Sequence, residues 1–350
     1  HIYLDQVQNM IWRYVRVRHE VEFSKFDAIT INNTRHVVLD HLSVSYGSDE
    51  GTSVSNNRGA HYPSDGISIQ YCLFAENKTG HILGAINPVI MGGEMSYHNN
   101  FTANTTHRFP NTAADGRYEV INNLVYNWKF RLLNVVNSPR LNHINNHYKV
   151  GGAIRSHYGT TGEYGRVLHK MNLSVTSTAS IYTAGNYITG FLTDPEADNW
   201  RSWSIFITAN GYSEDDPVPK TLQSKAPHPM LGAAIPLLTA QAISQDLPQN
   251  VGAFRTLDEG GAVVIYRDAV DEKHIDAYQD DTGGTFSYAS EPFVYPTIPS
   301  NAPYADTDAD GMPDAWESAN GFDPGLDDSA ADADHDGYTN LEEFLNLVDR

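Results

Sequence analysis

An Asn-Asn pair recurs in the sequence at a constant interval. The pairs are Asn99-Asn100, Asn122-Asn123 and Asn145-Asn146, so successive pairs lie 23 residues apart. An interval of this length is typical of stacked supersecondary units, each of which buries its apolar face only against its neighbours. An Asn at the same corner of successive units can also donate a hydrogen bond from its amide to the amide of the next unit. We therefore expect a solenoid that contains a ladder of asparagines.

The segments between these pairs have the pattern of short strands. Residues 27–148 contain runs of four to six β-branched and aromatic residues separated by polar turns, and no run keeps the 3.6-residue period of a helix. Ala28–Ile31 and Ile67–Tyr71 are examples. Short strands in units of this length predict an all-β fold, specifically a right-handed parallel β-helix.

The rest of the chain is less regular. Residues 160–300 contain Pro-rich stretches and one helical pattern near 238–245, which we interpret as later coils and an extended segment packed along the solenoid. Asn301-Ala302-Pro303 marks a linker. We therefore expect two domains: a β-helix over residues 1–300 and a small tail over residues 301–350.

The charge of the chain is strongly negative and uneven. The net charge is −20, and residues 301–350 contain 14 Asp or Glu but one Arg. Such a surface repels nucleic acid phosphates and anionic lipids, so we expect neither as a partner. The absence of a run of about 20 apolar residues predicts no membrane-spanning helix. Cys72 is the only cysteine, which excludes an internal disulfide, and its surroundings predict a buried thiol.

The tail contains two calcium-loop patterns. Each has oxygen-bearing side chains at positions 1, 3, 5, 9 and 12 of an EF-hand loop and a glycine at position 6. The first loop has Asp306, Asp308, Asp310, Asp314 and Glu317 around Gly311, and the second has Asp332, Asp334, Asp336, Asn340 and Glu343 around Gly337. Alternating carboxylates supply the oxygen ligands that Ca²⁺ prefers, and the glycine permits the sharp turn. We therefore predict two Ca²⁺ sites.

With short flanking helices and Trp316, Leu341 and Phe344 as apolar contacts, the tail resembles the dockerin or thrombospondin type 3 modules of secreted bacterial polysaccharide enzymes. The resemblance implies a secreted, bacterial protein whose tail is structural or tethers the chain to a partner protein. Without calcium we expect the tail to be largely unfolded, because its carboxylates repel one another.

The solenoid sequence contains five blocks that occur together in a known family. They are Asp27-Ala28-Ile29-Thr30-Ile31, Val38-Leu39-Asp40-His41, Met95-Ser96-Tyr97-His98-Asn99-Asn100-Phe101, Arg108-Phe109-Pro110 and Arg267-Asp268-Ala269-Val270-Asp271-Glu272. In content and order they resemble pectate lyase family 1, a family of polysaccharide lyases with the parallel β-helix fold. The resemblance covers roughly residues 9–285.

The resemblance implies a secreted lyase that cleaves pectate or a related 4-linked uronate polymer by β-elimination. Removal of the C5 proton beside the C6 carboxylate requires calcium or Lys and Arg to neutralise that carboxylate. The family's base is the Arg of its Arg-x-Pro motif, here Arg108. Because arginine is normally protonated, this role implies an alkaline optimum. We assign substrate binding to Arg117, Lys78, His81 and His98.

The active-site calcium ligands depart from the family pattern. Asp27 matches one ligand of the family, and Asp49 or Glu50 matches another. The family has a second carboxylate four residues further on, where this sequence has Ser53. We therefore expect an active-site Ca²⁺ that is bound more weakly or in a different manner.

Two other functions stay open. A non-catalytic carbohydrate-binding or adhesive β-helix is consistent with the missing carboxylate. A polygalacturonase-type hydrolase would need paired acids, and no Asp-Asp pair with a Gly-His-Gly neighbour occurs. In each case we expect a monomer with an acidic polysaccharide as its partner. The family has further coils before the stretch that Asn9–Arg16 resembles, so we expect the first coils to be missing or replaced by another cap.

Overall fold

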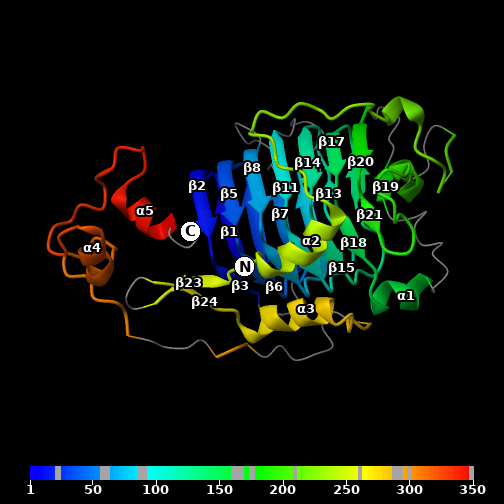
Figure 1. The fold of residues 1–350 in the computed structure, drawn as a ribbon. Coiled ribbons are helices and arrows are strands. Elements are labelled where there is room, and N and C mark those ends of the chain that lie inside the picture. Colours follow the sequence, from blue (N-terminus) through cyan, green and yellow to red (C-terminus); the bar gives the residue numbers. More distant parts are fainter. Residues whose placement is uncertain are drawn as a thin grey trace. The chain divides into compact units, whose positions relative to one another are not determined.

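The computed structural model consists mainly of parallel strands wound into a solenoid (Figure 1). It describes residues 1–19, 25–55, 64–84, 93–158, 169–172, 178–207, 211–213, 215–258, 262–285, 295–297 and 302–346. Along the chain, strands are added in turn to three parallel sheets, so that each coil contributes one strand to each sheet. This arrangement confirms the all-β parallel β-helix expected from the sequence.

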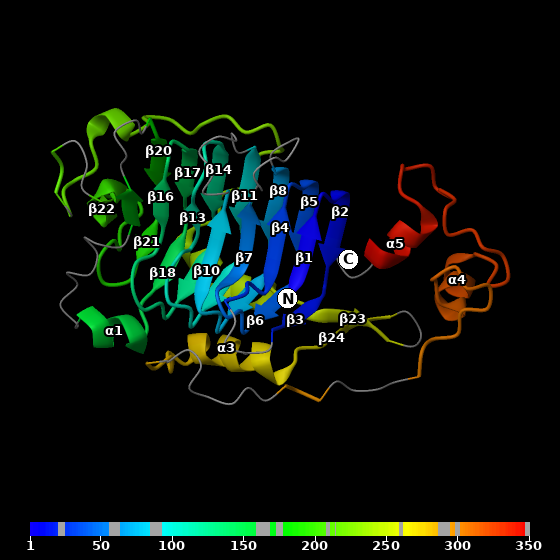
Figure 2. The same ribbon diagram turned by 180° about the vertical axis from the view of Figure 1, so that it is seen from behind.

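The three sheets are named A, B and C. Sheet A contains β1 (Ile2–Asp5), β4 (Ile29–Asn32), β7 (Glu50–Ser55), β10 (Thr79–Leu83), β13 (Asn111–Thr112), β16 (Asn134–Val136), β19 (His169–Asn172) and β22 (Trp203–Ile207). Sheet B contains β2 (Gln8–Arg13), β5 (Arg35–Asp40), β8 (Asp65–Gln70), β11 (Glu94–His98), β14 (Arg117–Ile121), β17 (Arg140–Ile144) and β20 (Ser180–Ala184). Sheet C contains β3 (Arg16–Arg18), β6 (Ser43–Ser45), β9 (Leu73–Ala75), β12 (Phe101–Ala103), β15 (Leu124–Tyr126), β18 (His147–Lys149) and β21 (Tyr187–Ile188). Figure 2 shows the strands from the opposite side, stacked from blue to green along the solenoid.

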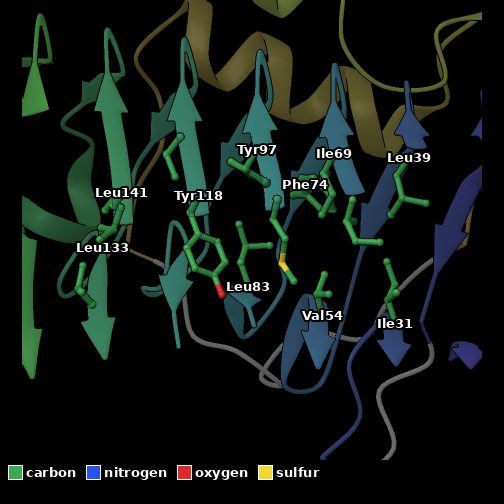
Figure 3. Close-up of a cluster of buried hydrophobic side chains, with 14 of the residues drawn as sticks. Ile31, Leu39, Val54, Ile69, Phe74, Leu83, Tyr97, Tyr118, Leu133 and Leu141 are labelled. Carbon is green, nitrogen blue, oxygen red and sulfur yellow. The ribbon is translucent and has the colours of Figure 1, made fainter. Parts of the chain in front are cut away.

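Apolar side chains at alternate positions of the strands fill the interior of the solenoid. In sheet B, Leu39 pairs in register with Ile69, and Ile69 with Tyr97, so like positions stack from coil to coil. All three side chains are at most 1% exposed. Figure 3 shows these residues pointing inward opposite sheet A residues such as Val54 and Leu83. A two-residue period therefore places one face of each strand in the core.

The asparagine ladder lies at the corner between sheets B and C. The Nδ2 atom of Asn100 donates to Oδ1 of Asn123 (3.2 Å), Asn123 donates to Asn146 (2.9 Å), and Asn146 donates to Asn186 (2.9 Å). The ladder continues to Asn199 (2.8 Å). The last two members do not keep the 23-residue interval, because Asn186 follows Asn146 by 40 residues and Asn199 follows Asn186 by only 13.

One coil replaces the ladder asparagine by cysteine. The backbone N–H of Cys72 donates to Oδ1 of Asn100 (2.9 Å), and the N–H of Leu42 donates to Sγ of Cys72 (3.4 Å). The thiol is fully buried, as expected, and burial raises the pKa of Cys72 above its ordinary range. This cysteine is therefore a structural residue.

Two helices cover the outer face of sheet C. Helix α2 (Ala240–Asp246) lies where the sequence predicts a helix, and α3 (Ala269–Gln279) follows later in the chain. Ile243 of α2 and Ile275 and Tyr278 of α3 pack on apolar residues of sheet C. Over β9, β12 and β15 the outer surface of this sheet is therefore part of the core.

A buried carboxylate anchors α3. Asp271 accepts hydrogen bonds from Arg18 (2.9 Å) and from the Ser43 hydroxyl (2.5 Å), both of which belong to sheet C. The family-like block around Asp271 therefore has a structural role, since it holds the helix against the sheet.

The extended segment predicted after the coils also lies along the solenoid. Asn142 exchanges two hydrogen bonds with the backbone of His228 (2.8 and 2.9 Å), and Asn122 bonds the backbone of Pro236 and Leu238 (2.8 and 3.0 Å). Short helical elements complete the described chain of this region: α1 (Gly152–Tyr158), η2 (Asn199–Ser202), η3 (Lys220–Leu222) and η4 (Leu247–Gln249).

The chain divides into two compact units. The first contains His1–Gly252 and Val270–Tyr295, and the second contains Ala253–Ala269 and Pro296–Arg350. The second unit includes a hairpin of β23 (Arg255–Leu257) and β24 (Val263–Ile265), and the helices α4 (Asp314–Asn320) and α5 (Asn340–Asn346). Asn301, the first residue of the predicted linker, lies outside the described residues.

Candidate active site

Stacking of the coils brings together one turn from each of four successive coils, just before sheet A. Asp27 precedes β4, Asp49 precedes β7, Lys78 precedes β10, and Arg108 lies shortly before β13. Backbone hydrogen bonds join the turns: the N–H of Ala28 donates to the carbonyl of Glu50 (2.9 Å), and that of Thr79 donates to Asp49 (2.8 Å). Residues up to 81 positions apart in sequence thus form one row.

Three carboxylates of this row form a compact cluster. Asp27, Asp49 and Glu50 each place one carboxylate oxygen within 4.8 Å of the others. Asp27 is well supported: it accepts hydrogen bonds from the hydroxyls of Thr30 (2.8 Å) and Ser53 and from the backbone N–H of Glu50 (3.1 Å). Three clustered carboxylates repel one another, so a cation between them is favourable, and an all-oxygen set suits calcium.

Arg108 lies beside this cluster. Its guanidinium forms an ion pair with Glu50, and both side chains are largely or half buried. Burial lowers the pKa of Arg108, and the charges of Asp49 and Asp27 partly oppose that shift. The site therefore holds a desolvated guanidinium next to carboxylates that a cation could neutralise.

The backbone fixes the position of Arg108. The residue has φ of 73°, and its carbonyl accepts a hydrogen bond from the N–H of His81 (2.7 Å). Gly80 packs so closely against this carbonyl that an added Cβ atom would overlap it. A strained conformation persists where neighbours determine it in this way, and such residues concentrate at functional sites.

Lys78 is also part of the row. Its backbone N–H donates to the carbonyl of Gly47 (2.9 Å), and its side chain is half-buried. Within the described ranges no hydrogen bond or ion pair engages its ammonium group. This charge is therefore available to an anionic ligand.

The other three substrate-binding predictions are not supported by the positions of the side chains. His81 is 0% exposed inside the solenoid, where its Nε2 bonds the hydroxyl of Tyr97 (3.0 Å). Arg117 and His98 belong to sheet B, where Arg117 pairs with Glu94 (2.6 Å). The sequence prediction was wrong for His81 because strand alternation turns its ring inward. For Arg117 and His98, which lie in sheet B and not in the row that contains Arg108, substrate binding stays a prediction.

Several residues of the site had no assigned role in the sequence analysis. Thr30 and Ser53 orient Asp27, and Gly80 provides space for the Arg108 carbonyl. Asn77 accepts a hydrogen bond from the N–H of Gly47 (2.8 Å) and supports the turn before Asp49. Ser53 occupies the position at which the pectate lyase pattern has a carboxylate. Of these residues, it alone was indicated by the sequence as part of the site.

The tail residues form two further groups of carboxylates. Asp306, Asp308 and Asp310 lie within the distance limits of a common ion, as do Asp332, Asp334 and Asp336. The glycines at position 6, Gly311 and Gly337, have φ of 98° and 101°, as the predicted loop turn requires. Among the remaining predicted ligands, Asp314 and Asn340 bond the backbone N–H groups of Thr307 (2.7 Å) and Ala333 (3.2 Å), Glu317 is buried, and Glu343 is half-buried.

Taken together, the fold and the site define a parallel β-helix protein with a carboxylate cluster, a lysine and a desolvated arginine along one corner of its coils. None of the helices in the described ranges is both long and apolar enough to span a membrane. No protein-family profile matches the chain.

Comparison with the sequences of known proteins identifies relatives that share one name. The chain is 27% identical over 349 residues to a protein of Emericella nidulans named probable pectate lyase C, which covers 97% of this chain and 70% of the relative. It is 26% identical to a protein of the same name from Aspergillus fumigatus, over 97% of this chain and 71% of the relative. The similarity supports the resemblance to pectate lyases carried by the sequence motifs. These relatives are fungal, so they give no support to the expected bacterial origin.

Among solved structures, a thermostable pectate lyase superimposes with a TM-score of 0.52 and 16% sequence identity. The match covers 72% of this chain and 63% of that structure, so the chain spans less than two thirds of its length. At this identity the likeness establishes the parallel β-helix fold alone.

Proposed function

We propose that the protein is a polysaccharide lyase that cleaves pectate or a related 4-linked uronate polymer by β-elimination. The observation that carries the proposal is the row of Asp27, Asp49, Glu50, Lys78 and Arg108 at one corner of the β-helix. The pectate lyase names of relatives that align with 97% of the chain agree with it.

The chemistry needs a base and a means of neutralising negative charge. Arg108 takes the proton from C5 of a uronate, the C4–O4 bond breaks, a C4–C5 double bond forms, and the departing O4 takes a proton from water. Charge that develops on the C6 carboxylate must be stabilised in the transition state. Calcium, when bound, supplies this stabilisation.

The residues present fit calcium. Asp27, Asp49 and Glu50 offer three carboxylates, and in the pectate lyase pattern a further carboxylate stands where this chain has Ser53. Ser53 instead donates a hydrogen bond to Asp27. Three protein carboxylates leave coordination positions that substrate carboxylates and water can complete, which makes affinity depend on the substrate.

Arg108 acts as the base in its neutral form. Burial lowers its pKa, and occupation of the carboxylate cluster by a cation would remove the opposing effect of Asp27 and Asp49. The pKa of an arginine remains high even after such a shift, so activity rises toward alkaline pH. Lys78 binds a uronate carboxylate through its free ammonium group.

The tail leads us to infer that the protein acts outside the cell. EF-hand-type loops of extracellular modules are filled at calcium concentrations of about 0.1–1 mM, which the cytosol does not provide. Secretion of the chain by its native host, detected in the culture supernatant, is the expected outcome; retention of the chain in the cytosol would contradict it.

The test is incubation with polygalacturonate at alkaline pH, with calcium or with a chelator. We expect ultraviolet absorbance from the unsaturated uronate product, in proportion to new reducing ends, and a strong decrease with chelator. Reducing ends without that absorbance would indicate a hydrolase, and retention on the polymer without either signal would indicate a binding protein. Each of these two results would refute the proposal.

A further inference from the structure

Glu317 is an unusual carboxylate in the second unit. It is 0% exposed, and neither of its oxygens has a hydrogen-bond partner. A buried, unpaired carboxylate is costly, and proteins retain one where it meets a metal or another ligand.

The first calcium loop contains further unpaired oxygens. Oδ2 of Asp308 and Oδ2 of Asp310 are also buried and lack hydrogen-bond partners. Asp306 completes the group, and its two oxygens orient the loop by accepting from the N–H groups of Asp310 (3.2 Å) and Gly311 (3.1 Å). The loop thus supplies four carboxylates, three of which have orphaned oxygens, and this is a donor set for one hard divalent cation.

The second loop has the same backbone but a different environment. Asp336 and Gly337 donate to Asp332 at 3.2 and 3.1 Å, as their counterparts do in the first loop. However, Asp334 and Asp336 are exposed, and no oxygen of the second loop is both buried and unpaired among the described residues. Its position 9 is Asn340, whose amide nitrogen is already bonded to Asp328 (3.0 and 3.1 Å). Fewer charges and greater exposure predict a weaker site.

Glu317 also connects the first loop to the small core of the unit. The adjacent Trp316 packs with Met312 and Phe344, and Leu257 of the hairpin packs against this cluster. A unit of about 70 residues with so small a core needs a further source of stability, such as a structural metal. Ordering of α4 by a cation therefore provides the surface on which the hairpin packs.

We propose that the first loop is a calcium site closed by Glu317, that it binds calcium more tightly than the second loop, and that calcium in it orders the hairpin Ala253–Ala269 together with the tail. The hairpin is separated in sequence from the calcium loops by residues 270–295, which belong to the first unit. Calcium at this site is therefore inferred to control a segment between α2 and α3, and not the tail alone. The proposal is independent of the lyase activity.

Hydrogen exchange of the full chain, measured by mass spectrometry over a calcium titration, tests the proposal. We expect added calcium to slow exchange both in the tail and in peptides that cover residues 253–258 and 262–269. Glu317→Gln keeps the volume of the side chain and should move the midpoint of protection to at least about tenfold higher calcium. Glu343→Gln, the matched change in the second loop, should move it by less than about twofold.

A third variant separates the two classes of calcium site. Asp27→Asn alters the active-site cluster in the first unit and should leave the midpoint for the hairpin unchanged. The proposal is overturned if Glu317→Gln leaves the midpoint in place, if Glu343→Gln moves it equally, if Asp27→Asn abolishes the protection, or if exchange in the hairpin is insensitive to calcium. Glu317→Gln removes a repelling charge, so its thermal unfolding in chelator should occur no earlier than that of the wild-type chain, which excludes misfolding as the cause.

Discussion

Replacement of Asn123 by alanine tests whether the asparagine ladder holds the coils together. The Asn123 side chain is 3% exposed and takes part in four hydrogen bonds. Its amide nitrogen donates to the carbonyl of Tyr97 (2.9 Å) and to Asn146 (2.9 Å), and its oxygen accepts from the backbone N–H (3.0 Å) and the amide (3.2 Å) of Asn100.

The expected loss follows from the groups left without partners. The side-chain amide of Asn100 still donates a hydrogen bond to the carbonyl of Ile69. The side-chain oxygen of Asn146 still accepts a hydrogen bond from the backbone N–H of residue 123. The N–H of Asn100 loses its partner, which costs about 1–3 kcal/mol for a buried group, and the carbonyl of Tyr97 loses one hydrogen bond, which is worth about 1 kcal/mol. We therefore expect a decrease of about 3 kcal/mol in the free energy of unfolding, which lowers Tm by about 4–6 °C in a unit of this size.

Urea unfolding followed by circular dichroism, with calcium present throughout, measures this loss. Asn142→Ala is the matched control, because Asn142 is equally buried but makes only two hydrogen bonds, both to the extended segment at His228. That segment can separate and become hydrated, so we expect a cost of about 1–2 kcal/mol. A loss below about 1 kcal/mol for Asn123→Ala, or a loss equal to that of the control, would refute the reasoning.

Three further predictions concern the site and the interior. Asp27→Asn should raise the calcium concentration for half-maximal lyase rate at least about tenfold, and Ser53→Asp should lower it, because the affinity for calcium depends on the number of carboxylate ligands. An unchanged calcium concentration for half-maximal rate in both variants would count against calcium binding at this cluster. Gly80→Ala should displace the Arg108 peptide and reduce kcat up to about a hundredfold. Gly284→Ala is the control and should leave kcat unchanged, because a Cβ atom at Gly284 meets open space. Equal kcat values for the two variants would show that close packing of Gly80 against Arg108 is not required for activity. Burial lowers the pKa of His81 to about 3 from 6.5, so its contribution to stability is complete above pH 6.5 and is lost as pH falls toward 3. His81→Gln should therefore reduce the acid-side slope of unfolding free energy by about 1.4 kcal/mol per pH unit, and an unaltered slope would contradict this account.

The architecture was largely predictable because its signal is local and repeated. The interval between Asn100, Asn123 and Asn146 defines the coil, and strand-length apolar runs define the sheets. The positions of Asn186 and Asn199 were not predictable, because an insertion in the coil before Asn186 lengthens the interval to 40 residues and Asn199 follows Asn186 by only 13. Such insertions are tolerated thermodynamically, since the closure entropy of a loop grows slowly with its length.

The candidate site was predictable only where a residue type itself carries the chemistry. Asp27, Asp49, Glu50 and Arg108 do so, and the stacked turns bring them together. His81 shows the limit of this approach, because the direction of a side chain depends on the strand register, which motif position alone does not reveal.

The pairing of the hairpin with the tail could not have been predicted either. Leu257 contacts the core of the calcium-loop unit although the next described tail residue lies more than 40 positions away in sequence. Neither the hairpin nor the tail contains a sequence pattern that predicts contact with the other. Long-range packing of this kind appears only in the folded structure.

The central claim is that Arg108, beside the carboxylate cluster, takes the C5 proton of a uronate polymer. The most direct test is the rate of unsaturated product formation by Arg108→Ala at saturating calcium and polygalacturonate, compared with the wild-type chain. A positioned base contributes about a hundredfold to ten-thousandfold, so we predict a loss of that size, with binding of the polymer retained. Full activity in this variant would contradict the mechanism even if the protein is a lyase.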